Sequence, residues 1–199
     1  QTPDTQAASF TGFAPLDGGL SKIKEERKDA FALIEGDTGP VKWEVGVRYE
    51  TTNVSITDLT PAGLSAKQDY EHFLPSASAK ISVGNGGRIT ISGARTVRRP
   101  RFDYITPVAL TEELGDNVFK GNPLLKPESA WGVDLRFEQG IGSTGVIGVN
   151  FFYRDIKDLV EVFNTGEPGD ATDLGDPDDP TDDHLTWVHQ PRNTGGGQV

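Results

Sequence analysis

Apolar and polar residues alternate without a break from Val41 to Glu50. The apolar set is Val41, Trp43, Val45, Val47 and Tyr49, and the polar or small set is Lys42, Glu44, Gly46, Arg48 and Glu50. A period of two places one set on each face of a β-strand. Residues 131–138 repeat the pattern, with Trp131, Val133, Leu135 and Phe137 at alternate positions. Both stretches are therefore predicted to be strands with one apolar and one polar face.

Short glycine-rich stretches separate further strand pairs. Residues 84–87 read Gly-Asn-Gly-Gly between the alternating stretches 75–83 and 88–96, and these residue types tolerate the positive φ angles of tight turns. Similar turns are predicted at 36–40 and 140–145. The pattern predicts three antiparallel hairpins.

Long polar segments lie between the hairpins, near 57–69, 100–128 and 164–184, well above the usual connection length of about 4–6 residues. The alternation of short and long connections predicts an all-β fold of antiparallel up-and-down strands, about seven in number, ending at 184–190. An outer-membrane barrel has this asymmetry, with apolar faces toward lipid and polar faces toward a wet interior. A soluble β-sandwich would bury the apolar faces against each other. Periodicity alone leaves both architectures open.

The segment from Leu20 to Ile34 has two interpretations. Leu20, Ile23, Arg27, Phe31 and Ile34 lie near helical spacing around a run of charges, which suits a short surface helix. We favour a loop that rises into a strand at Ala30, because the next residues lead straight into a hairpin turn.

Composition narrows the class of protein. The 199 residues include 24 Gly and 13 Pro, and only 35% are hydrophobic. No apolar run is long enough for a transmembrane helix, but membrane-spanning β-strands leave no such run. The net charge of −11 argues against nucleic acid as a partner. Cysteine and methionine are absent and residue 1 is Gln, so we expect an excised or processed piece without thiol chemistry.

Five short stretches occur in a fixed order along the chain. They are Val45–Glu50 (VGVRYE), Leu74–Lys80 (LPSASAK), Ser92–Phe102 (SGARTVRRPRF), Gly121–Ser129 (GNPLLKPES) and Phe152–Val160 (FYRDIKDLV). Together they resemble the barrel of the TonB-dependent outer-membrane receptors, a family of active transporters. The resemblance covers about residues 30–159 and implies that residues 1–199 are an internal segment of a large transmembrane β-barrel, with no plug domain.

The resemblance also implies a function. It predicts a bacterial outer-membrane location, contact with outer-membrane lipid, and import of a scarce small-molecule nutrient, such as iron-siderophore, carbohydrate or cobalamin. Energy would come from the TonB complex acting through the absent plug. The alternative is a soluble secreted or periplasmic β-rich ligand-binding module.

Arg95, Arg98, Arg99 and Arg101 gather where a predicted strand runs into a long loop. Guanidinium groups bind carboxylates and phosphates in a bidentate way, so these residues are candidates for binding an anionic ligand. The other interpretation is structural pairing with carboxylates that face the interior. The resemblance implies that second role for Arg99, which matches the family's arginine before proline.

An acidic stretch without basic residues runs from Glu167 to Asp183. Its carboxylates could hold Ca²⁺, although its prolines also suit a solvated loop. The candidate ligands are Asp176, Asp178, Asp179, Asp182 and Asp183. We expect no other cofactor.

Catalytic motifs are lacking. His72, His184 and His189 have no zinc-hydrolase spacing and no serine lies in a nucleophile elbow. A glycosidase built on Asp155 and Asp158 is a distant third possibility. We expect a protein that is not an enzyme.

Overall fold

A long antiparallel sheet dominates the structure, a computed structural model that describes residues 20–60, 63, 65–110, 117–169 and 186–199. The sheet has seven strands in the order β1-β2-β3-β4-β7-β8-β11, and each strand is antiparallel to its neighbours. The strands are β1 (Ser21–Thr38), β2 (Val41–Asp58), β3 (Ser65–Val83), β4 (Gly87–Arg98), β7 (Glu128–Ile141), β8 (Gly145–Lys157) and β11 (Gly196–Gln198). The predicted all-β antiparallel class is confirmed.

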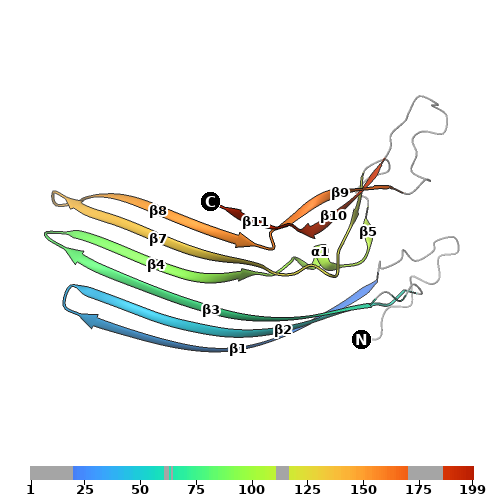
Figure 1. Cartoon of the computed structure of the whole chain (residues 1–199), viewed down its shortest axis with the longest axis horizontal. Helices are drawn as coiled ribbons and strands as arrows, with labels where there is room; N and C mark the ends of the chain where they lie inside the picture. Colours follow the sequence, from blue (N-terminus) through green and yellow to red (C-terminus); the bar gives the residue numbers. More distant parts are fainter. Residues whose placement is uncertain (1–19, 61–62, 64, 111–116, 170–185) are drawn as a thin grey trace, which may run out of the picture.

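Three tight turns lie at one end of this sheet, and Figure 1 shows the long connections at the other. We call these the turn end and the loop end. The turns join β1 to β2, β3 to β4, and β7 to β8. Each contains a glycine at positive φ, including Gly39 at 63°, Gly86 at 80° and Gly142 at 60°, which explains why glycine occupies these positions.

A second, smaller sheet lies at the loop end. Its strands are β5 (Ala109–Leu110), β6 (Val118–Lys120), β10 (Trp187–Asn193) and β9 (Val160–Pro168), in that order. The short helix α1 (Phe102–Ile105) precedes them in the chain. The stretch 184–190, expected as the last strand of the main sheet, instead contributes to β10, and the seventh place belongs to β11. Three glycines near the end of the chain had concealed β11, because glycine is depleted in strands.

Two expectations about strand ends are wrong. β1 begins at Ser21 rather than at Ala30, since Ser21 to Asp29 pair residue by residue with Asp58 to Glu50. β2 and β3 likewise remain paired as far as Thr57 and Ser65, so the loop expected at 57–69 shrinks to a short connection. Most side chains at these strand ends are polar, and the apolar Val54 and Ile56 lie on the inner face. The apolar alternation of the outer face, which had marked the strands elsewhere, is therefore lost there.

The two faces of the sheet differ in character. One row of register partners crosses six strands through Gly36, Trp43, Ala79, Ile91, Leu135 and Phe151. Its large members are exposed, from 36% at Trp43 to 66% at Phe151. The predicted partition of β2 is confirmed, because Trp43, Val45 and Tyr49 lie exposed on this face while Glu50 is buried on the other. We call the apolar face the outer face and the opposite one the inner face.

The inner face is covered at the loop end. Val54 and Ile56 of β2 form a buried cluster with Ile105 of α1 and with Leu125, which is 0% exposed. Tyr70 packs against this cluster and donates its hydroxyl hydrogen to the Leu125 carbonyl oxygen at 2.8 Å. The segment 121–128 is therefore a packed part of the structure that leads into β7.

Among the described residues, no helix is long and apolar enough to cross a membrane.

Candidate functional site

A buried carboxylate on the inner face joins three distant parts of the chain. The side chain of Glu50 on β2 is only 3% exposed, and its Oε2 lies 3.2 Å from Nη2 of Arg27 on β1. Its Oε1 forms an ion pair with the guanidinium of Arg99, which follows β4. A buried carboxylate is costly unless it is paired, so these two guanidiniums make the position of Glu50 tolerable.

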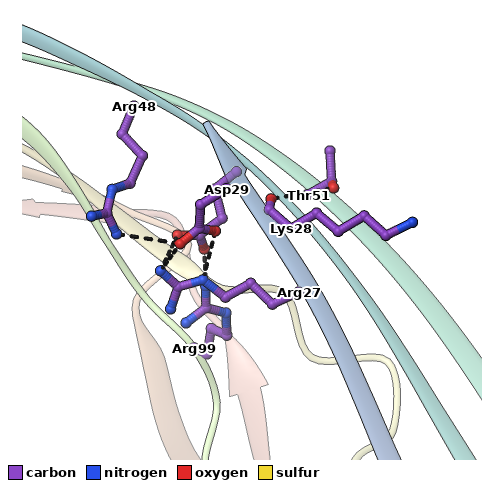
Figure 2. A network of polar contacts seen from close by, with 7 residues as sticks. Arg27, Lys28, Asp29, Arg48, Thr51 and Arg99 are labelled. Atoms are coloured by element: carbon purple, nitrogen blue, oxygen red, sulfur yellow. Dashed lines mark hydrogen bonds and ion pairs between the residues drawn. The ribbon is translucent and has the colours of Figure 1, made fainter. Parts of the chain in front are cut away.

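Asp29 extends the arrangement along β1. It accepts a hydrogen bond from Nε of Arg27 at 2.7 Å and one from Nη1 of Arg48 at 3.4 Å. Figure 2 shows Arg27 and Arg48 in contact with Asp29, and the guanidinium of Arg99 close to them. We call Arg27, Asp29, Arg48, Glu50 and Arg99 the charge cluster.

Strand register explains why the charge cluster needs three cations. Asp29 and Glu50 are direct partners across β1 and β2, so two carboxylates face the same side at neighbouring positions. Like charges placed directly opposite destabilise a sheet. Three arginines offset the two acids and leave the charge cluster with a formal charge of +1.

A second ion pair joins β4 to β7. Arg98 and Glu128 are register partners, and the guanidinium holds the carboxylate at two points, Nε to Oε2 at 2.6 Å and Nη2 to Oε1 at 3.0 Å. Nearer the middle of the sheet, Arg154 of β8 donates to both carboxylate oxygens of Asp134 at 2.9 Å. The inner face therefore presents paired charges along most of its width, which suits contact with water or with a polar partner.

The four arginines predicted to bind an anionic ligand do not converge. Arg98 and Arg99 are engaged by Glu128 and Glu50, as the alternative of structural pairing expects. Arg95 lies on the outer-face side, opposite Trp131, and donates to the Phe73 carbonyl oxygen at 3.4 Å. Arg101 pairs with Asp103 at 2.8 Å in an exposed position. Anion binding by these residues stays a prediction.

The predicted calcium ligands, Asp176, Asp178, Asp179, Asp182 and Asp183, lie outside the described residues, so calcium binding there also stays a prediction. Within the described ranges, no group of three or more His, Asp or Glu side chains is arranged to hold a metal ion. His72 lies on β3 and His189 on β10, in different sheets.

Sequence reasoning missed Arg27 and Asp29, because the run of charges around them was assigned to a loop. A signal was available in the alternation of odd-numbered and even-numbered positions along the strand. Arg27 and Asp29 share the odd-numbered positions of β1 that pair with the even-numbered, polar positions of β2. Extending the hairpin backward from the turn at Gly39 would have placed both beside Glu50.

A family model described as TonB dependent receptor-like, beta-barrel matches residues 2–199. No curated protein sequence matches the chain.

Solved structures share the fold. The siderophore receptor PirA from Pseudomonas aeruginosa is 15% identical with a TM-score of 0.56, over 89% of this chain and 38% of the receptor. The hemophore receptor HasR of Serratia marcescens, a double mutant in complex with the hemophore HasA and heme, is 14% identical with a TM-score of 0.61, over 87% and 30%. The ferric enterobactin receptor PfeA from Pseudomonas aeruginosa, a mutant in complex with enterobactin, is 13% identical with a TM-score of 0.53, over 90% and 32%. The chain thus spans about a third of the length of each.

Proposed function

Because this chain belongs to the TonB-dependent receptor-like β-barrel family, we propose that it forms part of the wall of a transporter that imports a scarce small-molecule nutrient. Proteins of this family reside in the bacterial outer membrane and are transporters, not enzymes, and both statements apply to this chain. We further propose the class of nutrient, the small molecule that carries it and the source of energy for its import.

The main observation behind this proposal is the apolar outer face. On β2 its apolar positions run from Val41 to Tyr49, a length of nine residues, and a strand needs about 9–11 residues to cross the hydrocarbon of a bilayer. Beyond Tyr49 the outer positions of β2 become Thr51, Asn53, Ser55 and Thr57. The change from apolar to polar supports a lipid-facing band that ends near Tyr49.

Aromatic side chains mark that edge. Tyr49 and Phe73 are direct partners on β2 and β3, while Trp131 of β7 and Tyr153 of β8 lie near the same edge on later strands. All four are exposed, between 44% and 57%. Aromatic girdles at the lipid boundaries are typical of outer-membrane barrels, so these residues support the same limit of the band. The tight turns at one end and the long connections at the other support an orientation with the loop end outside the cell.

The charged inner face supports a water-filled interior. In this proposal a plug domain from the rest of the protein would occupy that interior and receive energy from the TonB complex. The paired charges described above would then line a wet wall, where charged side chains are tolerated.

The relatives suggest the class of nutrient. PirA and PfeA are named as siderophore and ferric enterobactin receptors, and HasR as a hemophore receptor. We therefore place iron carried by a small molecule first, and carbohydrate or cobalamin second. Arg101, with a side chain 74% exposed at the loop end, remains the arginine of the original four best placed to meet an anionic ligand from outside.

The deciding measurement is the environment of the outer face. Nitroxide labels at Val47 and Val133 of the full-length parent protein in bilayers should be relaxed by oxygen and shielded from a water-soluble relaxation agent. A label at Asp134, which faces inward, serves as the control and should respond to the water-soluble agent. Labels at Val47 and Val133 that respond to neither agent would indicate a protein core and a soluble β-rich module.

A further inference from the structure

The chain bends sharply between β8 and β9. Asp158 adopts a φ of 55°, which is uncommon for any residue other than glycine. β8 remains paired with β7 up to the partners Lys157 and Ser129. Beyond the bend, β9 pairs only with β10 among the described strands. On the side where β7 paired with β8, the first backbone groups of β9 therefore have no partner among the described strands.

Glu128 supplies the missing acceptor. Its Oε1 accepts a hydrogen bond from the backbone N–H of Val160 at 2.7 Å. The carboxylate is itself held in place by the two-point contact with Arg98, and Glu128 is only 7% exposed. At the point where β7 begins, a side chain thus acts in place of a neighbouring strand.

Asn193 secures the other side of the bend. Its Nδ2 donates to the Asp158 carbonyl oxygen at 2.8 Å and to the Lys126 carbonyl oxygen at 2.9 Å, while its Oδ1 accepts from the Lys126 N–H at 2.8 Å. The side-chain amide therefore bonds to Lys126 as a strand backbone would. Pro127 biases Lys126 toward an extended conformation, in which its N–H and C=O point to the same side.

Backbone contacts also hold the bend in place. The Asp158 N–H donates to the Gly195 carbonyl oxygen, and the Leu159 carbonyl oxygen accepts from the Thr194 N–H. Two side chains hold two more groups of the bend, because Glu128 accepts from the Val160 N–H and Asn193 donates to the Asp158 carbonyl oxygen. A bend at positive φ is costly for a residue other than glycine and persists only where its surroundings fix it.

We propose that Glu128 and Asn193 are positioning residues that together fix the direction in which the hairpin of β9 and β10 leaves the main sheet. We call the two side chains and the Lys126 backbone the clasp. The clasp gives a physical role to the Lys-Pro-Glu part of the segment 121–129. The clasp would have this role whatever the hairpin contacts, so the inference does not depend on the proposed transport.

The test measures a distance across the bend, which changes when the direction of the hairpin changes. Spin labels at Asn150 on β8 and Glu167 on β9 of the full-length parent in bilayers report the distance across the bend by pulsed electron resonance. With the clasp intact, the distance distribution should be narrow. Glu128→Ala and Asn193→Ala should each widen it at least twofold. Glu161→Ala, which removes an exposed carboxylate from β9 without touching the clasp, is the matched control and should leave it unchanged.

A conservative variant separates the clasp from the ion pair and guards against misfolding. Glu128→Gln keeps an acceptor for the Val160 N–H but loses the charge that faces Arg98, so its distribution should stay close to that of the parent. Folding of each variant is checked by its heat-modifiable migration on a gel. Two results would overturn the proposal: narrow distributions in folded Glu128→Ala and Asn193→Ala, or a Glu128→Gln distribution as wide as that of Glu128→Ala.

Discussion

The indole of Trp43 lies directly over Gly36, its register partner on the neighbouring strand. A Cβ atom added at Gly36 would overlap the six-membered ring of the indole. Glycine is therefore required on β1 by the side chain of β2, and the pair covers an exposed part of the outer face near the turn end.

Replacing Gly36 by Ala should destabilise the folded protein by about 1–3 kcal/mol, because the new methyl group forces the indole out of its position. Unfolding of the full-length parent by guanidinium measures the difference. Gly93→Ala is the control, since a Cβ there meets its nearest neighbour at 3.6 Å and should change stability little. Equal stability of the Gly36 variant and the parent would show that the indole moves without cost.

Loss of Arg99 should be far more damaging than loss of Arg101. Arg99→Ala leaves the buried Glu50 with one guanidinium fewer, and breaking a buried ion pair costs about 3–5 kcal/mol. Arg101→Ala removes an exposed pair with Asp103, of a kind that contributes about 0–1 kcal/mol. Denaturant unfolding of both variants checks the order. The double variant Arg99→Ala with Glu50→Gln should recover part of the loss, because no unpaired buried charge remains.

Replacing the two adjacent leucines of the segment 121–128 should change its stability to very different extents. Leu125 is 0% exposed and Leu124 is 69% exposed. Leu125→Ala should destabilise the packing of this segment by about 2–5 kcal/mol, whereas Leu124→Ala should stay within about 0.5 kcal/mol of the parent. Hydrogen exchange of the amides in 119–128 gives the local free energies. Similar protection in the two variants would contradict the buried cluster.

Gly121 should tolerate no side chain. An added Cβ would overlap the Thr106 carbonyl oxygen, which is backbone and cannot rotate away. Gly121→Ala should therefore loosen the segment against α1, and limited proteolysis between residues 100 and 127 should become at least several-fold faster. Gly195→Ala is the control, because nothing lies within 4 Å of a Cβ at that position. Unchanged proteolysis of the Gly121 variant would show that the two segments can separate without loss of order.

The sequence was most informative where one face of a strand meets an apolar environment. Val45 and Val133 sit in runs with a strict period of two, and both were assigned correctly. Ser21 to Asp29 carry no such period, because Ile23 is the one apolar residue among them, and the start of β1 was missed there. A period of two in the sequence indicates that one face of a strand contacts an apolar environment. Backbone pairing alone does not require particular residues, so a strand with two polar faces is hard to recognise.

The charge cluster was harder to predict because its members are brought together by register. Arg27 lies 23 residues before Glu50 and Arg99 lies 49 residues after it in the numbering, and only the pairing of β1 with β2 and the course of the chain after β4 place them side by side. The motifs had singled out Arg48, Glu50 and Arg99 one by one. Nothing in their spacing indicated that Glu50 would be buried.

The strands continue well past the apolar band, and this sets the depth of the charge cluster. From Glu50 to Asp58, β2 takes eight further steps of about 3.3 Å each, which amounts to about 26 Å. We call this part of the strands the collar. The lipid-facing band of β2 covers the same number of steps, from Val41 to Tyr49, so in the proposed orientation the collar would stand about as tall above the lipid as that band is within it. A molecule arriving from outside would first travel along the collar, past the covered surface around Val54 and Ile56, before it came level with Glu50. Size and shape would then be tested at the rim, before the molecule reached the charge cluster.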